Sequence, residues 1–220
     1  MEEKNKKILL WIVDLLINLA IILILVVVIQ KWIIAPFDVS GSSMCDTLNN
    51  IEEECKGGFG EKIIINEAVY VFNEPVRGDI VVFRSLEHSD KYFIKRIIGM
   101  PGDTVEIKEG EVYVNGEQID EPYLNETNKG KTKIYLSNFS VFEVPEENYF
   151  LLGDNRKAST DSRSCFSSSL SITCKENPEQ AFIHRDSIRG KAWLVWWPLS
   201  SLRVIESISY ELSSESLAEK

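Results

Sequence analysis

The hydrophobic pattern divides the chain into two unlike parts. Residues 8–34 are almost wholly apolar and are interrupted only by Asp14, Asn18, Gln30 and Lys31. About 20 apolar residues suffice to cross a bilayer, so this segment is predicted to be one transmembrane helix. A cleavable signal peptide would have an apolar region of about 7–15 residues that ends in small side chains, whereas this one is longer and ends in bulky ones. The pattern therefore indicates an uncleaved membrane anchor.

Charges on either side of the anchor predict its orientation. Lys4, Lys6 and Lys7 precede the apolar segment, whereas Lys31 stands alone at its far end. Because basic residues favour the cytoplasmic side, residues 1–7 are expected in the cytoplasm and the rest of the chain outside. The expected location is thus the plasma membrane, with a single pass and direct contact with the lipid bilayer.

After the anchor, the pattern changes to short alternating or β-branched runs, which are typical of strands. Nine runs are predicted as strands: 62–65, 68–72, 79–84, 92–98, 104–108, 111–114, 133–136, 149–152 and 191–197. Asn115-Gly116 is a hairpin signal between the run at 111–114 and residues 117–119. No long amphipathic helix is predicted after residue 36. The outer part should be mainly antiparallel β.

Composition predicts the boundaries of this outer domain. It is expected to span residues 35–206, with 103–148 as an inserted β subdomain. A Ser- and Glu-rich stretch at 207–220 is predicted to be a flexible tail. Two further segments without periodicity, 49–60 and 164–186, look inserted, and we interpret the second as a surface loop.

Charge and cysteine content narrow the function. The 220-residue chain has a formal net charge of −10, which argues against a nucleic-acid partner. Its four cysteines lack CxxC spacing and only two histidines are present, so a zinc site is not expected. Local pairing, Cys45 with Cys55 and Cys165 with Cys174, is the simplest of three connectivities and suits an oxidising compartment.

Lys95 is poorly matched to its surroundings. It lies in the predicted strand 92–98, where alternation places it on one face with Phe93 and Ile97 and places Arg96 on the other. A half-exposed strand could leave one of these two charges in water but not both, so one of them lies on a covered face. A desolvated lysine loses proton affinity and can act as a base. The alternative is a stem packed on apolar surface with the ammonium group reaching water.

Five blocks, taken in order behind the anchor, resemble one family. They are GSSMCDTL at 41–48, RGDIVVF at 77–83, KRIIGMPGD at 95–103, GDNRKASTDSR at 153–163 and GKAWLVWWPL at 190–199. Singly, each has a plain explanation as a linker, a strand, a turn or a polar loop. Together they are similar to the type I signal peptidases, in the bacterial form that uses a serine and a lysine.

The resemblance implies a role for several residues. Ser43 would be the nucleophile, with its backbone N–H holding the oxyanion, and Lys95 the general base. Ser159 would hydrogen-bond the lysine amine, which is expected to lie away from the carboxylates of Asp46 and Asp161. Structural ion pairs are implied for Asp154, Arg156, Asp161 and Arg163. The chemistry agrees, because a serine hydroxyl needs an adjacent base, and burial can lower a lysine pKa to about 7–8.

Two positions depart from the family pattern. Gly41 stands where some members carry a hydroxyl that helps to hold the oxyanion, and whether a neighbouring serine or a water replaces it is open. Asp46 replaces the family's proline, which removes a fixed φ and adds a charge near the site. A bridge between Cys45 and Cys55 could restore the lost rigidity.

The resemblance implies a serine endopeptidase that removes N-terminal signal peptides from exported preproteins through an acyl-enzyme on Ser43. It also implies small pockets for Ala-like residues at the −1 and −3 positions of the substrate. The function expected for the chain requires no metal or organic cofactor. Contact with the secretion translocon is a further expectation. Alternatives are a self-cleaving repressor-type Ser/Lys protease, the eukaryotic reticulum form of signal peptidase, and an inactive, membrane-tethered binding module. The membrane anchor argues against the repressor-type protease. The reticulum form would carry a histidine in place of Lys95, and an inactive module would not be expected to keep Ser43, Lys95 and Ser159 intact.

Overall fold

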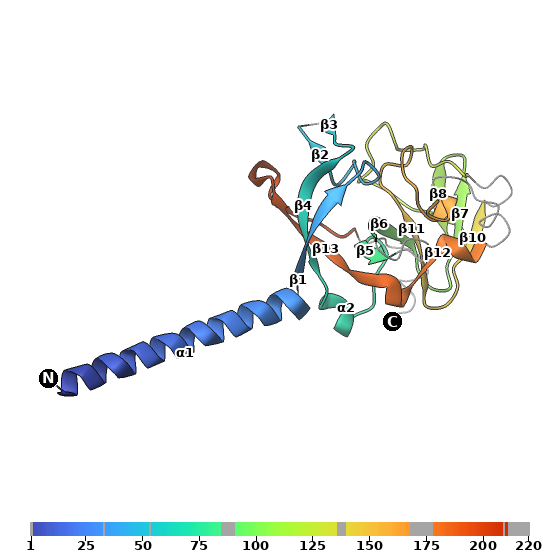
Figure 1. The fold of residues 1–220 in the computed structure, drawn as a ribbon. Helices are drawn as coiled ribbons and strands as arrows, with labels where there is room; N and C mark the ends of the chain where they lie inside the picture. The colour runs from blue at the N-terminus through green and yellow to red at the C-terminus, as the bar shows by residue number, and fades with distance from the viewer. Residues whose placement is uncertain are drawn as a thin grey trace.

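The structure, a computed structural model, consists of a long N-terminal helix and a β domain (Figure 1). It describes residues 2–32, 34–52, 54–84, 91–135, 140–167, 178–208 and 210. The helix α1 (Glu2–Trp32) projects away from the domain, and its part Glu3–Val27 is long and apolar enough to cross a membrane. It begins earlier than the predicted segment because the lysines and glutamates at the N-terminus are good helix formers. It ends before residue 34, where the first strand already starts.

Eight strands of the described chain form one antiparallel sheet, in the order β1-β4-β13-β5-β6-β11-β12, with β14 beside β13. They are β1 (Ile34–Ser40), β4 (Phe59–Asn66), β5 (Ile80–Arg84), β6 (Tyr92–Gly99), β11 (Asn148–Leu152), β12 (Phe182–His184), β13 (Ile188–Trp197) and β14 (Arg203–Val204). The sheet curls, since the rings of Phe37 in β1 and Tyr92 in β6 touch edge to face at 5.3 Å although three strands separate them. The predicted antiparallel β fold behind one N-terminal helix is confirmed.

A smaller sheet of four described strands lies within residues 103–148, in the order β10-β7-β8-β9. Its strands are β7 (Thr104–Lys108), β8 (Glu111–Val114), β9 (Glu117–Gln118) and β10 (Val141–Glu143). Asn115 and Gly116 both have positive φ, of 53° and 86°, as the tight hairpin turn between β8 and β9 requires. The hairpin predicted from these two residues is confirmed.

Three clusters of buried apolar side chains hold the sheets together. One of them lies between β1, β4, β5 and β13 and also takes in Met44 and Leu48, which are 1% and 0% exposed. Burial of a side chain of this size stabilises a fold by about 1.5–3 kcal/mol. The segment that contains Ser43 is thus anchored into the core by the residues that follow it.

Seven of the nine predicted strands are present, in β4, β5, β6, β7, β8, β11 and β13. The run at 68–72 is wrong: Val69–Phe72 forms the short helix α2, whose first amide donates to the Asn66 side chain at 3.0 Å. The run at 133–136 is also wrong over its described residues, 133–135, which have no strand structure. There the Lys133 carbonyl accepts a hydrogen bond from Arg163 instead of joining a sheet.

The first predicted disulfide is confirmed. Cys45 and Cys55 are joined, with Cα atoms 5.4 Å apart, and the bridge ties the Ser43 segment to the small hairpin of β2 (Asn50–Ile51) and β3 (Glu54–Cys55). None of the three cysteines that the structure describes is free. Cys174 lies outside the described residues, so its pairing with Cys165 stays a prediction.

The C-terminal segment makes contacts beyond the point where a flexible tail was expected to begin. Ser207 Oγ donates to Asp79 Oδ1 at 3.0 Å, and Tyr210 Oη lies 3.0 Å from Tyr123 Oη. The carbonyl of Ile208 lies so close to Gly78 that a Cβ there would come within 1.9 Å of it. These residues therefore pack against the β domain.

Candidate active site

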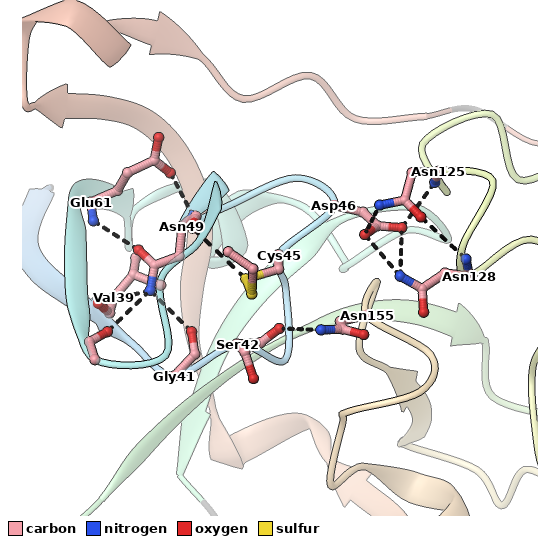
Figure 2. Close-up of a disulfide and its surroundings, with 12 residues drawn as sticks. Val39, Gly41, Ser42, Cys45, Asp46, Asn49, Glu61, Asn125, Asn128 and Asn155 are labelled. Atoms are coloured by element: carbon pink, nitrogen blue, oxygen red, sulfur yellow. Dashed lines mark hydrogen bonds between the residues drawn. A yellow bond between two sulfur atoms is a disulfide. The ribbon is translucent and has the colours of Figure 1, made fainter. Parts of the chain in front are cut away.

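Ser43 lies in the turn that follows β1. The backbone enters this turn at Gly41, whose φ of +90° suits a residue without a Cβ. Asn155 then holds the turn from the other side of the site, because its amide N–H donates to the Ser43 carbonyl at 3.0 Å. Its Nδ2 donates to the Ser42 carbonyl, also at 3.0 Å (Figure 2). The backbone on both sides of the Ser43 hydroxyl is therefore fixed.

Lys95 reaches this hydroxyl from β6. Its Nζ lies 2.7 Å from Ser43 Oγ and donates to the Ile94 carbonyl at 2.8 Å. Lys95 is only 3% exposed, which rules out the alternative in which its ammonium group reaches water. The sequence led us to expect one covered charge on this strand, but Arg96 on the opposite face is buried as well, at 1%. Both faces of β6 are covered at this point.

Burial lowers the pKa of Lys95 from 10.5 to about 8, the upper end of the range of about 7–8 that a buried lysine base was expected to have. The carboxylates of Asp161 and Asp154 act in the opposite direction, and the Arg163 guanidinium lowers the pKa further. The expectation that Lys95 is shielded from Asp161 is therefore wrong. At a pKa of about 8, roughly a tenth of Lys95 is neutral at pH 7, compared with about 0.04% of an ordinary lysine.

Asp154 forms an ion pair with Arg96, the residue next to Lys95. Arg96 Nε and Nη2 donate to the two Asp154 oxygens at 2.9 and 2.7 Å, and both side chains are almost fully buried. Thr47 Oγ1 donates to Asp154 Oδ2 at 2.5 Å, which links the pair to the Ser43 turn. The Arg96 guanidinium also stacks on the Tyr123 ring, 3.9 Å from its centroid. The pair fixes β6, and with it Lys95, relative to the loop at 153–163.

The other three predicted ion-pair residues on this loop, Arg156, Asp161 and Arg163, are also paired and buried. Arg163 donates to Asp161 at 2.8 and 2.7 Å, and the Gly153 N–H donates to the same carboxylate at 3.0 Å. Burial acts to raise the pKa of Asp161, but these contacts hold it below its usual value. Arg156 pairs with Glu121 of the inserted subdomain. The sequence did not predict the contacts that Glu121, Arg96, Thr47 and Asn155 make in the site. No local pattern reveals partners that are so distant in the chain.

Ser159 does not make its expected hydrogen bond to Lys95. Its Oγ is buried and lies on the side of Asp161, where it helps to hold the pKa of that carboxyl down, although no well-aligned hydrogen bond forms within the described part of the chain. It packs against Gly153, where a Cβ would come within 2.1 Å of Ser159 Oγ. In this structure the amine contacts Ser43 and a backbone carbonyl only.

The carboxylate of Asp46 contacts the loop at 125–128, next to the smaller sheet. It accepts hydrogen bonds from the backbone and side-chain amides of Asn125 and from the Asn128 side chain (Figure 2). Burial raises the pKa of Asp46, and these hydrogen bonds partly offset that increase.

A cleft of about 620 Å³ leads to Ser43 and Lys95. Its walls are the end of β1 and the following turn, the start of β6, and Ala158 and Thr160 of the polar loop. Because the cleft runs between two strands and opens onto both reactive atoms, it can hold an extended peptide with a carbonyl carbon next to Ser43 Oγ.

Comparisons with known proteins identify the family. The family described as "Signal peptidase, peptidase S26" matches residues 12–197. Signal peptidase I S of Bacillus subtilis is 36% identical over 91% of this chain and 95% of its own length. Signal peptidase IB of Staphylococcus aureus is 33% identical over 90% and 94%.

A crystal structure of a signal peptidase I from Enterococcus faecalis is 30% identical to the chain. It covers 54% of this chain and 97% of its own, with a TM-score of 0.40. The two relatives match about nine tenths of the chain, and the family match begins at residue 12, within the apolar helix, which supports membrane anchoring. The chain therefore belongs to the signal peptidase family, peptidase S26, and is a serine endopeptidase of the signal peptidase I type.

Proposed function

We propose that this chain cleaves signal peptides from exported preproteins and that Ser43 and Lys95 carry out the hydrolysis. The observation that supports this most directly is the 2.7 Å separation of Lys95 Nζ and Ser43 Oγ inside a covered site. Burial brings the pKa of Lys95 to about 8, so the amine is a usable base at neutral to mildly alkaline pH. A serine with an adjacent base is the arrangement that acyl transfer requires.

The reaction divides into two steps. In the first, neutral Lys95 Nζ takes the Ser43 proton while Oγ forms a bond to the carbonyl carbon of the scissile peptide. The tetrahedral intermediate collapses, its C–N bond breaks, and the leaving amine takes the proton from Lys95. In the second, Lys95 takes a proton from water, whose oxygen attacks the acyl carbon. The ester C–O bond then breaks, and protonated Lys95 returns the proton to Ser43 Oγ, which regenerates the hydroxyl and the neutral amine. The Ser43 backbone N–H is the proposed donor to the oxyanion in both steps.

The position of the site supports a substrate that emerges at a membrane surface. Ser43 follows Trp32, the end of α1, by only eleven residues, which span at most about 36–40 Å when fully extended. Trp193, Trp196 and Trp197 of β13 are 37–47% exposed, as suits aromatic side chains at a lipid interface. We place the N-terminus in the cytoplasm and the β domain outside, next to the bilayer and within reach of the translocon.

The test is cleavage of a preprotein by the full chain in detergent micelles. Ser43→Ala and Lys95→Ala are compared with the matched surface variants Ser140→Ala and Lys108→Ala. We expect the surface variants to retain full activity. Loss of the base should lower kcat/KM by about 10²–10⁴-fold, and loss of the nucleophile should abolish cleavage. Cleavage that survives either site substitution would overturn the assignment. A wild-type chain that binds the preprotein without cleaving it would favour an inactive binding module.

A further inference from the structure

Asp46 connects the Ser43 turn to the inserted subdomain. Its Oδ2 accepts from the Asn125 N–H at 2.9 Å, and its Oδ1 accepts from Asn125 Nδ2 at 2.8 Å. Asn128 Nδ2 approaches both oxygens, at 2.9 and 3.1 Å. Figure 2 shows the carboxylate facing these two amides across the gap between the turn and the subdomain loop. One side chain, three residues after Ser43, thus accepts all four of these contacts from Asn125 and Asn128.

The loop at 125–128 is built to present these donors. Asn125 Oδ1 accepts from the Thr127 N–H at 2.9 Å and from Thr127 Oγ1 at 2.6 Å, so the Asn125 amide group is oriented from within the loop. Asn128 is 3% exposed and has few alternative positions. Hydrogen bonds to an ionised acceptor are roughly twice as strong as neutral ones, so this contact is a firm restraint.

Asn128 also closes a ring of contacts around the nucleophile. Its Oδ1 accepts from the Lys157 N–H at 3.1 Å, on the polar loop that carries Asn155. Asn155 in turn holds the carbonyls on both sides of the Ser43 amide. The chain of contacts therefore runs from the Ser43 turn through Asp46 and Asn128 to the polar loop and back to the turn.

The Cys45–Cys55 bridge ties the same turn to the β2–β3 hairpin. Within the residues that the structure describes, no other hydrogen bond joins residues 41–48 to residues 103–148. A shift of about 1 Å in a reacting group can cost about a hundredfold in rate.

We infer that Asp46 is a positioning residue for the proposed reaction: its carboxylate holds the Ser43 turn against the 125–128 loop and so fixes Ser43 Oγ against Lys95 Nζ. The inference rests on the proposed roles of Ser43 and Lys95. A positioning role lowers kcat per folded molecule and leaves KM nearly unchanged, because the cleft wall at β1 and β6 is not altered. A purely structural role would lower only the folded fraction.

An exchange of the two side chains tests this. Asp46→Asn turns one oxygen into an NH₂ group that faces two donor amides, and Asn128→Asp places two carboxylates against each other. The double variant restores an amide–carboxylate pair with its polarity reversed, and its new carboxylate can still accept from the Lys157 N–H. Asp186→Asn, at a surface carboxylate that is 90% exposed, is the matched control.

Activities are measured with the full chain in detergent and divided by the folded fraction from thermal unfolding. We expect each single variant to lose about 10–100-fold in kcat with KM within twofold. The double variant should recover at least tenfold of that loss, and Asp186→Asn should match the wild type. If a single variant does not fold, Asn125→Ala, which keeps the backbone contact, should still lower kcat several-fold.

Three results would overturn the inference: kcat within twofold of wild type in both single variants, losses that vanish after correction for folded fraction, or no recovery in the double variant. These are distinct from failure of the proposed function. Activity that survives Ser43→Ala or Lys95→Ala would remove the reaction itself, whatever the Asp46 variants do.

Discussion

Lys95 should make the folded domain less stable at neutral pH than a neutral side chain at the same place would. Burial lowers its pKa from 10.5 to about 8. A difference of one pKa unit corresponds to about 1.36 kcal/mol, so the buried ammonium group opposes folding by about 3 kcal/mol. Below pH 8, lysine is charged in both the folded and the unfolded state, and the whole penalty applies. Between pH 8 and 10.5 the folded state has lost its proton while the unfolded state keeps it, so the penalty declines as the pH rises.

Lys95→Met measures this penalty because it removes the charge and keeps a flexible apolar stem. Thermal unfolding of the full chain in detergent is followed at pH 7 and pH 9 for the wild type and the variant. The stability of the variant relative to wild type should fall by about 1.3 kcal/mol between the two pH values, or about 3–5 °C in Tm. Lys108→Met, on the exposed end of β7, is the control and should show no such dependence.

The change in relative stability between pH 7 and pH 9 is more informative than the relative stability at either pH alone. The variant also loses the hydrogen bonds to Ser43 Oγ and the Ile94 carbonyl, each worth about 1 kcal/mol, but this loss is much the same at both pH values. A relative stability that is identical at pH 7 and pH 9 would refute the reasoning, because it would mean that Lys95 keeps an ordinary pKa in the folded domain.

Two further substitutions test the supports of the site. Cys55→Ser opens the bridge to Cys45 and should cost about 2.5–3 kcal/mol, seen as a lower Tm that reducing agent also produces in the wild type; an unchanged Tm would show that the bridge does not stabilise the domain. Asp154→Ala leaves Arg96 buried without its carboxylate and should cost about 3–5 kcal/mol in denaturant unfolding; a loss under 1 kcal/mol would mean that water reaches the guanidinium group.

The sequence was sufficient for the central strands of the sheet. The run at 92–98 is dense in β-branched and aromatic residues, and its strand carries Lys95 where alternation placed it. The turn at Asn115-Gly116 was equally clear, because both positions need positive φ. Both features are encoded by neighbouring residues, so they can be predicted without knowing what the strand or the turn packs against.

Elements whose structure depends on distant contacts were harder to predict. Residues 69–72 have strong strand propensity, yet they form a helical turn whose first amide donates to the Asn66 side chain. The strand β1 was missed because its residues follow the anchor without a break in hydrophobicity, and its pairing with β4 defines it as a strand.

The same distinction applies to the site. Ser43 and Lys95 stood out from short blocks of sequence, but the partner of Arg96 is 58 residues away in the chain. From the sequence, Asp46 was notable only because it replaces the family's proline and adds a charge near the site. Its contacts with a loop 79 and more residues downstream gave it a different interpretation.

The most direct test of the central claim is the pH dependence of kcat/KM for preprotein cleavage by the wild-type chain. If buried Lys95 is the base, the rate should be half-maximal near pH 8 and fall about tenfold for each pH unit below that. Burial and the Arg163 guanidinium lower the pKa that sets this midpoint, and Asp161 and Asp154 raise it. A rate that is flat from pH 6 to pH 9, or a midpoint near 6.5 as for an ordinary histidine, would contradict the account.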